Sequence, residues 1–113
     1  MGLRERIGID LGRRLKLEDG IVWAAQNGVR YIDIQLDTAA NAVTAFDDQR
    51  AARVRELAAK HGVTLGLHTL SAVNVAEYSP YVGEAVDAYL KSYIDIYPKL
   101  GAQWIVEIGR AHV

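Results

Sequence analysis

Four polar residues lie within or at the end of short apolar segments of the sequence. Asp10 ends the segment IGID, Asp33 and Gln35 lie in VRYIDIQL, and His68 ends VTLGLH. Imidazole, carboxylate and carboxamide groups bind metal ions or form hydrogen bonds with hydroxyl groups. If these segments are neighbouring strands, we expect Asp10, Gln35 and His68 to line a pocket, with Asp33 deeper on the face of Gln35 because strand residues two apart point the same way. Each residue could instead be structural and bonded only to its neighbours.

Four segments have the composition of β-strands. Residues 6–11, 29–36 and 63–68 are rich in β-branched residues, and Gly12 stops the first of them. The segment AQWIV, residues 102–106, contains the start of a fourth strand.

Three segments between these strands have the periodicity of helices. Residues 16–28 and 47–62 each end in a glycine, which is common after a helix C-terminus, and Asp47 or Asp48 is the N-cap of the second. The longest predicted helix spans residues 79–101 and begins at a Ser-Pro pair. The side chains that we expect to be buried along it are Val82, Val86, Tyr89, Tyr93 and Leu100.

Strands and helices therefore alternate along the chain, which is typical of a parallel α/β sheet with right-handed crossovers. Two architectures fit four strands: an open flavodoxin-like sheet, and half of a (β/α)8 barrel of typically about 250 residues. The segment after the first strand, GRRLKLEDG, lacks the GxGxxG turn of a dinucleotide-binding fold. Its basic residues could contact a phosphate or form a solvated loop. The alternation alone leaves both architectures open.

The composition is that of one small domain with balanced charge. The chain has 113 residues, is 50% hydrophobic, and carries 13 Lys and Arg against 14 Asp and Glu, for a net charge of -1. This balance argues against a nucleic-acid-binding protein with a basic face. The sequence has no cysteine, and no segment approaches the roughly 20 apolar residues of a membrane span. We expect a cytoplasmic protein without a nucleic-acid or membrane partner.

Residues 68–106 resemble a known family. His68 at a strand end, Asn74 a few residues later, and a long helix closing with LGA before an apolar strand resemble the third-strand loop, third helix and fourth strand of xylose isomerase-like TIM barrels. The segments IGIDLG and VRYIDIQL are similar to the first two strands. These proteins are sugar phosphate isomerases and epimerases, in one superfamily with endonuclease IV-type endonucleases. The resemblance implies an α/β fold, a partial (β/α)8 TIM barrel whose N-terminal half is residues 1–106.

The resemblance also implies a function: a metal-dependent isomerase or epimerase that moves a proton between adjacent carbons of a sugar or sugar phosphate. In the intact parent, a divalent cation (Mn, Mg, Co or Zn) would polarise the substrate, and later strands would supply the acid and base. His68 would bind the metal or the sugar. Gln35 and Asp10 would bind substrate, and Asn74 would do so or hold its loop. We expect this fragment by itself to be inactive and not to hold the metal.

Two alternatives remain open. An endonuclease IV-type zinc phosphodiesterase belongs to the same superfamily, although the near-zero net charge and the absence of a basic, aromatic-bearing DNA-binding loop count against it. The chain could also be a non-catalytic half-barrel whose first and fourth strands are open edges. We expect such a chain to form a homo-oligomer through these edges.

Residues 107–113 read EIGRAHV and depart from the family pattern. The fourth strand of the family usually runs into a segment like VVHxGxH, and Glu107 stands where its histidine is expected. Ile-Gly-Arg-Ala-His-Val followed by a stop is also the translation of a widely used sequencing-adapter oligonucleotide, ATC GGA AGA GCA CAC GTC TGA. We therefore expect residues 107–113 to be a non-native tail from adapter read-through, and we expect no function for His112.

Overall fold

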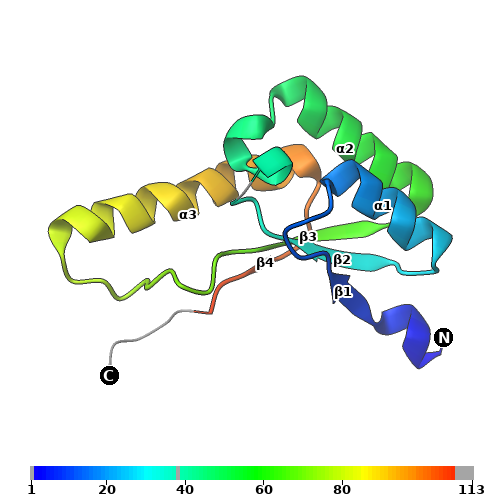
Figure 1. Ribbon diagram of the computed structural model, residues 1–113, viewed down its shortest axis with the longest axis horizontal. Coiled ribbons are helices and arrows are strands. Elements are labelled where there is room, and N and C mark those ends of the chain that lie inside the picture. Colours follow the sequence, from blue (N-terminus) through cyan, green and yellow to red (C-terminus); the bar gives the residue numbers. More distant parts are fainter. Residues whose placement is uncertain (1, 38, 109–113) are drawn as a thin grey trace.

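The computed structural model describes residues 2–37 and 39–108, and these form one four-stranded parallel sheet and three α-helices (Figure 1). The strands are β1 (Gly8–Asp10), β2 (Tyr31–Ile34), β3 (Thr64–His68) and β4 (Ile105–Val106). The helices are α1 (Leu17–Gln26), α2 (Asp48–His61) and α3 (Pro80–Leu100), with short 3-10 helices at Leu3–Arg6, Ala39–Asn41 and Val43–Ala45. None of the described helices has the length and hydropathy that crossing a membrane requires.

The predicted alternation of strands and helices is confirmed, and the sheet distinguishes between the two architectures that the sequence left open. A flavodoxin-like sheet does not pair its strands in chain order and has helices on both faces. Here each described strand pairs with the next along the chain, and all three helices lie on one side of the sheet (Figure 1). This arrangement is part of a (β/α)8 barrel, in which the helices form the outer ring.

The sheet has one apolar face and one polar face. Ile32 and Ile34 of β2, and Leu65 and Leu67 of β3, are at most 2% exposed and belong to the core that the helices cover. Because strand residues two apart share a face, the residues between them point to the uncovered side. That second face carries Asp10, Tyr31, Asp33, Gly66, His68 and Trp104. In a closed barrel it is the interior.

The connection from β2 to α2 is tied to the start of α1. Asn41 is 3% exposed; its Oδ1 accepts a hydrogen bond from Leu17 N at 2.8 Å, and its Nδ2 donates to Leu15 O at 2.7 Å. Arg50, in the first turn of α2, donates from Nε to Glu18 Oε1 at 2.7 Å. This hydrogen bond lowers the pKa of the Glu18 carboxyl below its usual value. These contacts hold together the loops that follow β1 and β2.

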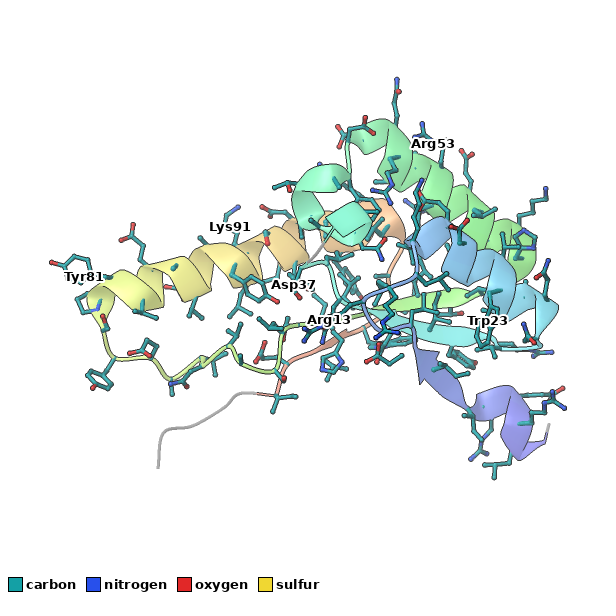
Figure 2. All side chains as sticks on the ribbon, in the orientation of Figure 1. Arg13, Trp23, Asp37, Arg53, Tyr81 and Lys91 are labelled. Atoms are coloured by element: carbon teal, nitrogen blue, oxygen red, sulfur yellow. The ribbon has the colours of Figure 1, made fainter. Side chains whose placement is uncertain are left out.

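The buried stripe predicted for the longest helix is wrong at its N-terminal end. Tyr93 and Leu100 are each 1% exposed, as predicted, whereas Val82 is 49% exposed. The 21 residues of α3 span about 32 Å, while the five residues of β3 span about 17 Å. The first turns of α3 therefore extend past the sheet, and Figure 2 shows Tyr81 at that far end. Apolar periodicity indicates which face of a helix is apolar but not how much of that face has a neighbour.

This difference along α3 predicts unequal effects of truncating its apolar side chains. We expect Leu100→Ala to lower the free energy of unfolding by about 2–5 kcal/mol, because it leaves a cavity in the core. Val82→Ala, in the same helix, should change it by less than about 0.5 kcal/mol. Urea denaturation followed by circular dichroism measures both. Equal losses for the two variants would contradict the packing of α3.

Candidate functional site

The carboxyl edge of the sheet brings two of the predicted site residues together. His68 Nδ1 lies 3.7 Å from Asp10 Oδ2, although β2 stands between the strands that carry them. The other carboxylate oxygen of Asp10, Oδ1, accepts a hydrogen bond from Gly12 N at 2.7 Å. Gly12 has a φ of 69°, a conformation that favours glycine in the tight turn after β1. Asp10 is thus fixed by its own loop and faces the imidazole.

One ring nitrogen of His68 has no hydrogen-bond partner in the part of the chain that the structure describes. Its Nε2 is buried, and no described residue forms a hydrogen bond with it. An unsatisfied buried polar atom costs about 1–3 kcal/mol, so it needs a partner from outside the protein or a functional reason. A carboxylate beside Nδ1 favours the proton on Nδ1, which leaves Nε2 as an acceptor in the neutral ring. The free nitrogen is therefore suited to accept a hydrogen bond from a hydroxyl group.

Gln35 follows β2 at the same edge. Its Oε1 accepts a hydrogen bond from Arg13 Nε at 3.3 Å. Arg13 belongs to the loop between β1 and α1, so this contact joins the ends of the first two strands; Figure 2 shows Arg13 near this end of the sheet. The sequence suggested only a phosphate contact or a solvated loop for the basic residues of this loop. The structure instead pairs Arg13 with a predicted site residue.

Asn74 is not joined to this group by any contact within the described residues. Its Oδ1 accepts a hydrogen bond from Ala76 N at 3.0 Å, which forms a local turn in the loop from β3 to α3. This turn is the loop-holding role that the sequence allowed. Substrate binding by Asn74 stays a prediction.

Thr69 and Glu107 lie where β3 and β4 end. Thr69 is 1% exposed; its N–H donates to Val106 O at 3.0 Å, and its Oγ1 donates to the Glu107 carboxylate. A carboxylate therefore stands at the position where the family pattern has a histidine. The non-native origin expected for residues 107–113 stays a prediction. Residues 109–113, His112 among them, lie outside the described residues.

Two tyrosines of α3 bind the backbone just after β2 and β3. Tyr93 Oη accepts a hydrogen bond from Leu36 N at 2.7 Å and donates to Asp37 Oδ2 at 2.9 Å, while Tyr89 Oη accepts from Leu70 N at 2.8 Å. Burial raises the pKa of Tyr93, so its hydroxyl keeps the proton that it donates. The sequence predicted packing alone for these tyrosines. Their spacing of four residues places both on one helix face but gives no sign of polar partners on distant strands.

Removing the Tyr93 hydroxyl should destabilise the chain. We expect Tyr93→Phe to lower the free energy of unfolding by about 1–3 kcal/mol, because Leu36 N–H loses its partner in the core. Tyr81→Phe is the matched control, since Tyr81 is 85% exposed and should tolerate the loss of its hydroxyl. Urea midpoints of the two variants compare them directly. A Tyr93→Phe chain as stable as Tyr81→Phe would show that the bond to Leu36 does not form.

A second row of side chains lies deeper on the same face. Trp104 Nε1 donates a hydrogen bond to Asp33 Oδ1, and the Trp104 ring centroid is 6.3 Å from that of Tyr31. A Cβ placed on Gly66 would lie 1.8 Å from Trp104 Cε2, so the indole occupies the space that any other residue at position 66 would fill. Asp33 thus has a structural partner, Trp104, which is one of the two roles that the sequence left open for it.

The described residues do not fit a complete metal site on their own. Among residues 2–37 and 39–108, no three His, Cys, Asp or Glu side chains are grouped closely enough to hold a metal ion. Asp10 and His68 offer one carboxylate and one imidazole, which divalent first-row metals accept as ligands. Even a catalytic zinc site usually has three protein ligands.

No family model and no curated protein matches the sequence. Among solved structures, the chain is similar to a D-psicose 3-epimerase in the presence of D-fructose, with a TM-score of 0.67 and 18% identity over 85% of this chain and 32% of that one. It is also similar to D-psicose 3-epimerase with D-tagatose from Clostridium cellulolyticum H10, with a TM-score of 0.74 and 14% identity over 94% of this chain and 41% of that one. The chain thus spans less than half the length of either enzyme.

At these identities the likeness shows the fold. It agrees with the pairing of the strands in chain order and with the helices on one side of the sheet. The chain therefore has the fold of one part of a (β/α)8 TIM barrel and is similar in this to the two epimerase structures.

Proposed function

We propose that this chain supplies one part of the active site of a sugar isomerase or epimerase, which moves a proton between adjacent carbons of a sugar or sugar phosphate. The observation that carries the proposal is the pair of Asp10 and His68 at the carboxyl edge, with His68 Nε2 left without a partner among the described residues. TIM-barrel enzymes have their active sites at this edge. The same fold serves many reactions, and the likeness to two sugar epimerases supports this one among them.

The proposal gives each residue of the edge a distinct role. His68 Nε2 accepts a hydrogen bond from a sugar hydroxyl, and Asp10 orients the imidazole from the Nδ1 side. Gln35, held by Arg13 through its oxygen, donates from its amide nitrogen to a second hydroxyl. The acid and base that move the proton belong, in this proposal, to strands that follow β4.

A divalent cation in such an enzyme acts as a Lewis acid on the substrate carbonyl. In the intact parent, His68 Nε2 would serve either as one of its ligands or as the acceptor of the sugar hydroxyl, because one nitrogen lone pair holds one partner. The remaining ligands would have to come from residues other than those described, because the described residues contain no group of three.

An endonuclease IV-type phosphodiesterase is the alternative within the same superfamily. It needs several zinc ligands and a basic surface for DNA. The described residues offer no group of three metal-binding side chains, and the sequence carries a net charge of -1, so no observation favours this alternative.

The proposed sugar contact predicts a selective response of one histidine. We expect D-fructose to shift the imidazole NMR signals of His68, because Nε2 gains a hydrogen-bond partner. His61 is an internal control, because it ends α2 before β3 begins, whereas His68 stands at the other end of β3. Asp10→Asn should weaken the response of His68, since the charge that orients the ring is lost. Equal shifts of both histidines, or none, would contradict the proposal.

We also propose that the isolated 113-residue chain self-associates through its sheet edges. β1 and β4 are the edge strands of the described sheet, and Ile9 and Val106 on them are 38% and 39% exposed. A charged side chain on an edge strand opposes pairing with another chain. Val106→Lys should therefore reduce the mass of the assembly measured by light scattering. Val82→Lys, in the exposed first turn of α3, should leave that mass unchanged. A monomeric unmodified chain would contradict this expectation.

A further inference from the structure

We propose that the indole of Trp104 forms the floor of the sugar site and that Gly66 is the residue that makes room for it. This inference rests on the proposed function, because it takes the edge formed by Asp10 and His68 as the mouth of that site. It adds an apolar surface, the Trp104 ring, below the polar groups of Asp10 and His68. The ligand chemistry it fits is a sugar that rests on the indole with its carbon-bound hydrogens and bonds to the edge with its hydroxyl groups.

Trp104 lies one row below His68 on the interior face. Gly66 and His68 share this face two residues apart on β3, a rise of about 6–7 Å along the strand. The indole stands directly over Gly66, since a Cβ there would be 1.8 Å from Cε2 and 2.0 Å from Nε1. The β3 backbone cannot give way easily, because β3 pairs with β2 on one side and with β4 on the other. The close approach therefore requires glycine.

The polar end of the indole is already occupied. Its single donor, Nε1–H, is bonded to Asp33, and the Tyr31 ring lies beside it. The rest of the ring is apolar, whereas the ends of β1 and β3 carry the polar groups of Asp10 and His68. A sugar has the same division, with hydroxyl groups around its rim and carbon-bound hydrogens on its faces. A polar rim above an apolar floor matches that division.

The bond to Asp33 separates this arrangement from ordinary core filling. TIM-barrel interiors are mostly packed with branched aliphatic side chains. Trp104 is instead only half-buried, and its ring is held in one orientation by a carboxylate. A ring held in one orientation presents the same apolar surface to a ligand.

The seat of the indole on Gly66 is tested in a Trp23→Phe background, where Trp104 is the only tryptophan. Gly66→Ala should expel the ring, move its fluorescence emission to longer wavelength and shift the NMR signal of its Nε1–H. Gly83→Ala is the matched control, because its nearest neighbouring atom is 3.6 Å from the new Cβ, an ordinary contact. If Gly66→Ala leaves both signals of Trp104 unchanged, the proposal is overturned.

The contact with sugar is tested in the same Trp23→Phe chain without further substitution, so the result does not depend on whether Gly66→Ala folds. D-fructose is the probe, and glycerol at equal mass concentration is the control solute. We expect nuclear Overhauser effects between sugar carbon-bound protons and the Trp104 ring, together with shifted His68 signals. If the His68 signals shift but no contacts with Trp104 appear, the proposed role of Trp104 is overturned, while the proposed function is not. If D-fructose produces neither the shifted His68 signals nor the contacts with Trp104, both this inference and the proposed function are overturned.

Discussion

The burial of one face of the sheet is the constraint on which the rest of the structure depends. Ile32, Ile34, Leu65 and Leu67 contribute about 1.5–3 kcal/mol each when buried, more than a typical hydrogen bond at about 0.5–1.5 kcal/mol. A register slip of one residue in a strand would turn these side chains outward and bury its polar residues instead. The apolar face therefore fixes the place of every polar side chain on the other one. The candidate site is a consequence of core packing.

The strand ends need a second set of contacts, because apolar packing does not orient a loop. Tyr93 and Tyr89 bind backbone N–H groups after β2 and β3, and Asn41 joins the loop after β2 to the start of α1. Each is a polar group partly or fully buried and bonded to a distant part of the chain. These contacts stabilise the backbone around His68 and Gln35. The same contacts thus serve stability and the geometry of the site.

Most polar groups at the carboxyl edge of the sheet have a hydrogen-bond partner within the protein. Asp10 accepts from Gly12, Gln35 accepts from Arg13, and Thr69 contacts Glu107. Against this background His68 Nε2 is an exception, since it is buried without a partner in the described part of the chain. Below it, Asp33 and Trp104 satisfy each other and leave an apolar ring surface. In the described residues, the interior face therefore combines a buried acceptor that has no partner with an apolar ring surface below it, a pairing that suits a small polyhydroxylated ligand.

The sequence by itself determined the order of the elements and the C-terminal ends of α2 and α3, because helix periodicity, strand composition and capping are local, whereas β1, β2 and β4 are shorter than the segments predicted for them. Gly62 and Gly101, with φ values of 66° and 68°, end α2 and α3 as predicted. It also placed Asp10 and His68 at strand ends. Only the tertiary structure decided that the strands pair in chain order, that Val82 is exposed, and which partners bind Tyr93 and Trp104. These features join residues far apart in the chain, and no local pattern specifies such contacts. The energy that selects them comes from packing the whole sheet against its helices.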